Sequence, residues 1–344
     1  MTLDKEHVFN AKWHDTIFIY RKKSSWIKKT VLALLFPFTL GRALCRKICR
    51  KKVLPSTQYR KKEIRTTAEV FARIWSEEEE NPLKTHFTTR LIRLHTPDGA
   101  ALSGVHYIHK QAEEQTPTVL LFQPNGSLVK HGEYDWLLSS CQKRGTVANF
   151  ISVDYRGCGE SSGKPMRIFD LILDGDTLYQ YVTSSLKKQP HQIFFYGHGL
   201  GGIVSAFVKN LHPQDPIKYV NERSFSSICK LVAKNHPYFG KVLAWMIRSL
   251  GWELNLSEHW GDLCGKKLVV FQKKDAIVPY SASLYYALQT KQNTSTDYLE
   301  LTTDQSIKNR RFHHSLPLQN YQAKETSLCA EDHVLSFLFS DDRT

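Results

Sequence analysis

A glycine-rich turn lies between two apolar runs near the middle of the chain. Ile193-Phe-Phe-Tyr196 precedes the turn, which reads Gly197-His-Gly-Leu-Gly-Gly202. Glycines spaced as G-x-G-x-x-G between a strand and a helix let the backbone approach a pyrophosphate, and an acid about 20 residues further on binds a ribose hydroxyl. Gly197, Gly199 and Gly202 have this spacing, and Glu222 is 20 residues past Gly202. Dinucleotide binding is therefore one chemistry that this turn allows.

Three further polar segments each follow an apolar run that is typical of a buried strand. They are Pro124-Asn-Gly-Ser127 after 118–122, Asp154-Tyr-Arg-Gly-Cys-Gly-Glu-Ser161 after 148–153, and Lys274-Asp-Ala-Ile-Val-Pro279 after 267–271. A histidine pair, His313 and His314, follows the last such run. Each segment alone is compatible with an ordinary turn or a surface histidine, so the interpretation depends on their order along the chain.

The elements that would position these residues alternate between strands and helices. Strand-like runs at 88–94 and 100–108 flank Pro97-Asp98-Gly99, which predicts an antiparallel β-hairpin. Six buried strands are expected at 118–122, 148–153, 192–196, 217–220, 267–271 and 297–301, with clear helices at 168–185 and 202–211. The alternation predicts an α/β domain with a mainly parallel central sheet, flanking helices and an antiparallel N-terminal hairpin.

In chain order, these segments resemble the motifs of the α/β-hydrolase superfamily over about residues 86–344. The stretch Asp154–Ser161 is similar to the Asp-x-Arg-Gly-x-Gly-x-Ser sequence common in that superfamily, and it is the most specific of the segments. The resemblance implies that residues 197–201 form the nucleophile elbow, which reads Gly-x-Ser-x-Gly in the family. Gly199 then stands where the family has its attacking serine.

The same resemblance assigns roles to the other segments. Asp275 corresponds to the acid of the catalytic triad, and His314, with His313 as the second choice, corresponds to the general base. The backbone N–H groups of an oxyanion hole would come from Asn125, Gly126 and Leu200. The Asp154–Ser161 loop is expected to have a structural role, with its arginine and aspartate bracing the glycines. The resemblance implies no cofactor and no metal site.

Glycine at the elbow changes the expected chemistry, because it offers no oxygen that could attack an acyl carbon. The first hypothesis is a membrane-associated pseudoenzyme that binds a small-molecule or acyl ligand or acts as a scaffold. The alternative is an active hydrolase of ester-type or peptide-type substrates that uses a base-activated water, or Ser127 or Cys158, in place of the missing serine. Residual rate enhancements of about 10³ to 10⁴ survive loss of triad members in other hydrolases.

The dinucleotide hypothesis remains as a third possibility. Its motif follows a β-hairpin and two further strands, whereas a dinucleotide site usually opens a βαβ unit. It would also leave the order of Asp154, Asp275 and His314 unexplained.

Charge is concentrated in the first 65 residues. They hold 17 Lys or Arg and four acids, or +13 of the total formal charge of +14. The apolar run Val31–Leu40 lies among these charges, but it is shorter than the roughly 20 residues of a spanning helix. We expect this arm to associate with an anionic membrane surface, with a single span as a further possibility. Nucleic acid is not the expected partner, because no zinc spacing or RNA-module signature accompanies the charge.

The chain is predicted to divide into a basic arm at 1–65, a helical linker at 66–85 and a hydrolase-like domain at 86–344. The alternative is that the arm packs on its own domain or is disordered. Seven cysteines without CxxC pairs indicate reduced thiols, which places the domain on the cytoplasmic side.

An aromatic insert is expected at about 226–265. It would form a lid over a cleft or pack as ordinary core. Together with the basic arm and Asn221–Ser227, it also resembles uncharacterised hydrolase-like proteins of chlamydiae and related intracellular bacteria.

Overall fold

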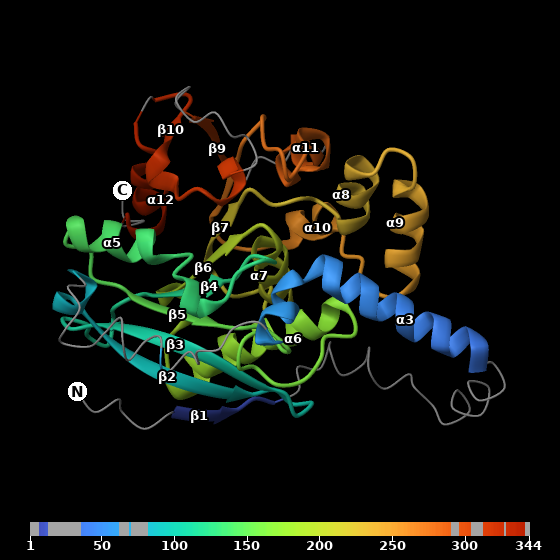
Figure 1. Cartoon of the computed structure of the whole chain (residues 1–344). Helices are drawn as coiled ribbons and strands as arrows, with labels where there is room; N and C mark the ends of the chain where they lie inside the picture. Colours follow the sequence, from blue (N-terminus) through green and yellow to red (C-terminus); the bar gives the residue numbers. More distant parts are fainter. Residues whose placement is uncertain are drawn as a thin grey trace.

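A ten-stranded sheet forms the centre of the molecule in the computed structural model, which describes residues 7–12, 36–61, 69, 82–289, 296–303, 312–326 and 328–340 (Figure 1). The strand order is β1-β2-β3-β5-β4-β6-β7-β8-β9-β10. Their bounds are His7–Asn10, Phe87–His95, Ala101–His109, Thr118–Phe122, Asn149–Val153, Ile193–His198, Lys218–Glu222, Lys267–Phe271, Thr296–Thr303 and Tyr321–Ala323 for β1 to β10.

Six neighbouring strands, from β5 through β4 and β6 to β9, pair in parallel. The hairpin β2–β3 is antiparallel, with Phe87 opposite His109, and β3 joins the parallel strands through an antiparallel pairing with β5. The predicted mainly parallel sheet with an antiparallel N-terminal hairpin is therefore confirmed. Since parallel strands run the same way, the ends of β4, β6 and β7 lie at one edge, where Phe122 pairs with Gly197 and His198 with Glu222.

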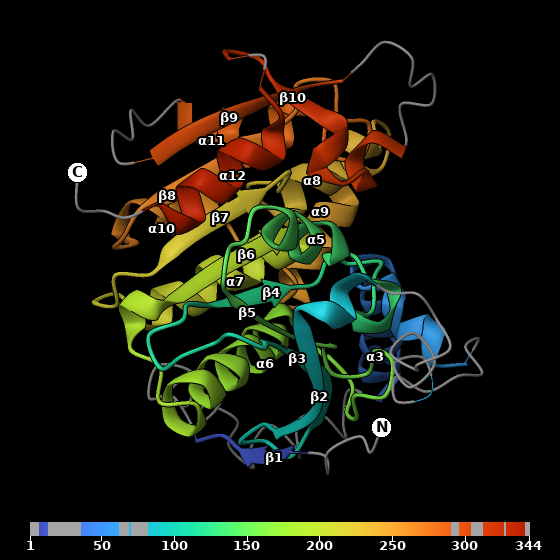
Figure 2. The ribbon, with the colours of Figure 1, turned by 90° about the vertical axis from the view of Figure 1, so that its left-hand side faces the viewer.

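Alternate strand residues face two separate cores. In β4, Leu120 and Phe122 belong to one buried cluster, and Val119 and Leu121 belong to the other. This period of two is the reason that a run of five apolar residues forms a strand buried on both faces. The helices that cover the two faces, shown in Figure 2, complete a three-layer architecture.

The first face packs against α6 (Ile168–Gln180), α7 (Leu200–Leu211), α10 (Leu256–His259) and α11 (Leu284–Gln289). The second face packs against α5 (Asp135–Lys143) and α12 (Ala330–Phe339). The predicted helix 168–185 ends as an α-helix at Gln180 and continues as one π-helical turn, Tyr181–Ser185.

The insert contains a helical hairpin, α8 (Ile228–Asn235) and α9 (Gly240–Ser249), followed by α10. Its aromatic residues divide between the two environments that the sequence left open. Trp252 and Trp260 are fully buried in the first core, while Tyr238, Phe239 and Trp245 are exposed.

The basic arm contacts the domain through β1 and through residues at the end of α3 (Phe36–Val53). β1 pairs in parallel with β2, and Leu54, which follows this long helix, is fully buried in the first core. No helix among the described residues is both long and apolar enough to cross a membrane. The predicted apolar run begins outside the described residues, and almost all of the predicted linker lies outside them as well.

Candidate functional site

The glycine-rich turn joins the end of β6 to the start of α7. Gly199 lies between them with φ 56° and ψ −114°, a backbone conformation that residues with a side chain rarely adopt. Its N–H donates to the carbonyl of Glu222 at 2.9 Å, and its carbonyl accepts from Ser224 Oγ at 2.8 Å. The end of β7 and the loop after it therefore hold the turn in this shape.

The other glycines of the turn allow close packing between backbones. A Cβ atom on Gly197 would lie 2.5 Å from the carbonyl oxygen of Gly201, and one on Gly201 would lie 2.0 Å from that of Phe122. A Cβ on Gly202 would lie 2.1 Å from Ser224 Oγ. Gly199 differs, because the nearest atom to its Cβ position is His314 Nε2 at 3.5 Å, an ordinary contact distance. The tip of the turn has room for a side chain that the neighbouring positions lack.

Asp275 and His314, which the sequence placed 39 residues apart, are in direct contact. His314 Nδ1 lies 2.6 Å from Asp275 Oδ2, and the other carboxylate oxygen of Asp275 accepts the N–H groups of Ile277 and Val278 at 2.8 and 2.9 Å. Burial alone would raise the pKa of Asp275, but the bonds from His314, Val278 and Ile277 lower it below its usual value. Asp275 is therefore a fixed carboxylate that orients the imidazole.

His314 has the geometry of a neutral base. Burial lowers the pKa of His314, and the neighbouring His198 lowers it further. The hydrogen bond with Asp275 has the opposite effect and raises this pKa. With its Nδ1 bound to Asp275, its Nε2 is directed toward the tip of the turn at Gly199. Of the second candidate, His313, only the backbone is described, in the same short 3-10 segment, Phe312–Ser315.

The three candidates for an oxyanion hole lie on two segments next to the turn. Leu200 is the first residue of α7, where N–H groups lack partners within the helix. Asn125 and Gly126 are exposed in the loop after β4, and neither donates its N–H to another described residue. The carbonyl of Asn125 accepts both the N–H and the hydroxyl of Ser56, at 3.3 and 3.1 Å. The arm therefore contacts this loop directly.

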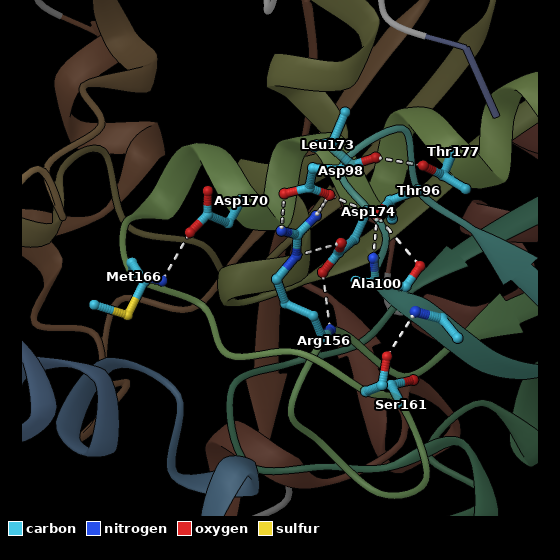
Figure 3. A network of polar contacts seen from close by, with 12 residues as sticks. Thr96, Asp98, Ala100, Arg156, Ser161, Met166, Asp170, Leu173, Asp174 and Thr177 are labelled. Atoms are coloured by element: carbon cyan, nitrogen blue, oxygen red, sulfur yellow. Dashed lines mark hydrogen bonds and ion pairs between the residues drawn. The ribbon is translucent and has the colours of Figure 1, made fainter. Parts of the chain in front are cut away.

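The loop Asp154–Ser161 is braced as expected, with Arg156 at the centre of the network (Figure 3). Arg156 Nε lies 2.7 Å from Asp174 Oδ1 on α6, and its Nη1 lies 2.7 Å from Asp98 Oδ2 in the hairpin turn. Asp154 Oδ1 accepts the N–H of Val129 at 2.8 Å, which connects this loop to the one after β4. The loop thus has a structural role.

The structure adds a second histidine, His198, which occupies the first variable position of the Gly-x-Ser-x-Gly motif. His198, the last residue of β6, is buried, and its ring centre lies 4.9 Å from that of His314. Its Nδ1 lies 3.3 Å from Glu133 Oε1, and its Nε2 is buried without a hydrogen-bond partner among the described residues. The site therefore contains two imidazoles, each next to a carboxylate. The only sequence signal for His198 was its place beside the tip of the turn.

Glu222 does not have the environment of a ribose-binding acid. It is buried, accepts a hydrogen bond from Tyr196 Oη at 2.5 Å and forms an ion pair with Arg223. Although burial alone would raise its pKa, the charges of Arg223 and His198 lower it. Because this carboxylate is already paired and the turn is closed by backbone contacts, the geometry does not support the dinucleotide hypothesis.

Neither alternative nucleophile bonds to the base. Ser127 Oγ donates to the carbonyl of Leu128 at 3.4 Å. Cys158 is buried next to Ser56, with 3.3 Å between Sγ and Oγ, and burial raises the pKa of its thiol far above the usual range. Within the described residues, no hydroxyl or thiol forms a hydrogen bond with His314 Nε2.

A groove with a volume of about 690 Å³ adjoins the site. Glu133, the partner of His198, and Pro317, three residues after His314, are among its lining residues, whereas neither of these two imidazoles lines it. Trp136, His86 and Gln319 contribute further to the lining. A groove of this size and mixed polarity is within the range that binds small molecules.

The chain is similar to three solved structures. An esterase of Pyrococcus furiosus has 16% identity and a TM-score of 0.50, with 64% of this chain and 84% of the esterase covered. An acetyl xylan esterase of Paenibacillus sp. R4 has 14% identity and a TM-score of 0.49, with 64% of this chain and 79% of the esterase covered. An α/β hydrolase of Vibrio vulnificus has 14% identity and a TM-score of 0.49, with 68% of this chain and 84% of the hydrolase covered.

No family model matches the sequence. The likeness to the esterase of Pyrococcus furiosus concerns the fold alone, and it agrees with the order and direction of the strands found here. The chain has an α/β-hydrolase fold.

Proposed function

We propose that the chain is a membrane-associated binding protein on an α/β-hydrolase fold, and that it forms no acyl-enzyme. One observation carries this proposal: Gly199 has no side chain, although a Cβ atom at this position would lie only 3.5 Å from His314 Nε2. An acyl-enzyme needs an oxygen or sulfur atom at that point, within reach of the base. Neither Ser127 nor Cys158 supplies one, because each makes contacts elsewhere.

A binding role is supported by what remains around Gly199. The groove of about 690 Å³ is lined by Glu133, so a ligand in it would lie next to the carboxylate that contacts His198. The turn, the neighbouring N–H groups and His314 Nε2 offer both donors and an acceptor to a polar group of a small-molecule or acyl ligand. The same site arrangement could position a protein partner for a scaffold role.

Hydrolysis by water is the second candidate, and the contact between Asp275 and His314 favours it. In this reaction His314 Nε2 takes a proton from a water molecule at the tip of the turn. The hydroxide adds to the acyl carbon, and the imidazolium then gives the proton to the leaving group. The lowered pKa of His314 favours the neutral imidazole, the form that can act as a base.

A fluorophosphonate probe together with an ester-hydrolysis assay distinguishes the two candidates. For the binding role we expect no labelling of the wild-type chain, and equal background hydrolysis by wild type and His314→Gln. Hydrolysis that His314→Gln abolishes, without labelling, would instead establish the water reaction. Stoichiometric labelling of the wild type would overturn both.

Membrane association rests on the arm. Residues 1–65 carry a charge of +13, and α3 holds six Lys or Arg without an acid. Each basic residue near an anionic surface contributes about 1 kcal/mol of attraction. We therefore expect sedimentation with phosphatidylserine vesicles that weakens in Lys47→Gln/Lys51→Gln, and unchanged sedimentation in that variant would contradict the role of α3. The cytoplasmic placement and the narrower resemblance to chlamydial proteins belong to this proposal as well.

A further inference from the structure

The hairpin α8–α9 presents an apolar face to solvent. Tyr238, Phe239, Val242 and Trp245 are 93, 72, 58 and 69% exposed. Residues 239, 242 and 245 are three apart, so they lie along one side of the helix start and its first turns. Three aromatic rings and a valine together exceed the scattered apolar residues of an ordinary surface.

The exposed face belongs to a firmly packed element. A Cβ on Gly240 would lie 2.6 Å from the carbonyl oxygen of Ala233, so α8 and α9 are in backbone contact where they meet. Ile247 and Leu250 on the inner side of α9 are buried in the first core. Because the inner side of the hairpin already packs against the first core, the exposed rings on the outer side are not needed to complete that core.

The charged residues of the hairpin itself have one sign. The stretch 228–252 contains Lys230, Lys234, Lys241 and Arg248, all exposed, and no acid. A surface that combines aromatic rings with cations and lacks anions complements an anionic lipid surface, where the rings lie at headgroup level and the cations bind the phosphates.

α3 offers the same combination at the same end of the molecule. Leu44 and Ile48, four residues apart, are 57 and 51% exposed among the basic residues of that helix. Figure 1 shows α3 and α9 on the same side of the sheet, at the right of the view. Two basic elements with exposed apolar side chains therefore lie on one side of the sheet.

We infer that the face formed by Tyr238, Phe239, Val242 and Trp245 docks into an anionic membrane, as a second contact beside α3. This inference rests on the proposed membrane association and assigns part of it to the hairpin. Asn235 Nδ2 at the end of α8 donates to the carbonyl of Ile277 at 3.2 Å, in the loop that holds Asp275. The docked hairpin is thus directly connected to the candidate site.

The test uses the full chain with vesicles of phosphatidylcholine containing phosphatidylserine. Phe239→Glu/Trp245→Glu is expected to lower partitioning at least about tenfold, because burial of one large apolar side chain is worth roughly 1.5–3 kcal/mol. Leu328→Glu is the matched control, since it places one acid on an exposed leucine far along the chain, and it should bind as wild type does. Partitioning of the double variant equal to wild type would overturn the inference.

Two further outcomes separate this inference from the proposed association. Loss of binding in Lys47→Gln/Lys51→Gln together with full binding by Phe239→Glu/Trp245→Glu would leave α3 as the membrane contact and remove the hairpin. Absence of wild-type binding would overturn both. Brominated lipids give a second readout: quenching of tryptophan fluorescence should decrease in Trp245→Phe, and unchanged quenching would overturn the insertion of this face into lipid.

Discussion

His314 Nδ1 and Asp275 Oδ2 lie 2.6 Å apart, on loops that follow β9 and β8. Two backbone N–H groups hold the carboxylate, and the far nitrogen of the imidazole is directed to the tip of the turn after β6. An acid and a base with this geometry remain beside a position without a side chain.

Gly199→Ser is expected to gain fluorophosphonate labelling, because its hydroxyl would extend from a Cβ 3.5 Å from His314 Nε2. The positive φ should make the variant about 1–2 kcal/mol less stable than wild type. Gly199→Ala is the control, with similar destabilisation in denaturant unfolding and no labelling. Labelling absent from a folded Gly199→Ser chain would show that Asp275 and His314 do not form a working relay.

Acidification from pH 7 to pH 5 is expected to destabilise the wild type more than His314→Gln. Burial lowers the pKa of His314 in the folded chain, so below pH 6.5 the unfolded chain binds more protons and unfolding becomes easier. Asp275, whose pKa is also lowered, titrates below this window. Urea midpoints at both pH values measure the difference, and equal pH dependence of the two chains would refute a buried neutral His314.

Removing the centre of the network in Figure 3 should be costly. Arg156→Met leaves the buried carboxylate of Asp174 and the partly buried carboxylate of Asp98 without their cation, a change that destabilises by about 3–5 kcal/mol. Arg167→Met removes an exposed pair with Asp170 and is expected to change the free energy of unfolding by less than about 1 kcal/mol. Similar urea midpoints for the two variants would mean that the loop Asp154–Ser161 is braced by other contacts.

The glycine next to the tip of the turn should not tolerate a methyl group. Gly201→Ala would place a Cβ 2.0 Å from the carbonyl oxygen of Phe122, so β4 and α7 would have to separate, at a cost of about 1–3 kcal/mol or more. Gly126→Ala places its Cβ in open space and should be within about 0.5 kcal/mol of wild type. Thermal unfolding compares them, and a neutral Gly201→Ala would contradict the close contact.

The sequence predicted the parallel strands and the hairpin because buried strands are continuous apolar runs and Pro97-Asp98-Gly99 is a turn. All six expected buried strands appear within two residues of their predicted ends. The structure also contains β1, β10, α5 and α12, which were not predicted. β1 and β10 are short edge strands whose sequences lack an apolar run, so only their tertiary pairing defines them.

The site was predicted to the extent that its residues follow strands. Asp275 and His314 could be named because both stand after buried runs. His198 and Glu133 could not, because their importance comes from a contact between residues 65 apart in sequence. The exposure of Tyr238 and Trp245 beside the burial of Trp252 was likewise not visible, since aromatic composition does not show which side of a helix meets the core.

Ser56 connects the basic arm to the loop after β4. It follows the end of α3 by three residues and holds the carbonyl of Asn125 with two hydrogen bonds. Three residues span at most about 11 Å, so the C-terminal end of α3 is kept within that reach of the loop after β4. The basic helix is therefore fastened directly to the edge of the sheet that carries the candidate site, as by a short rigid bracket.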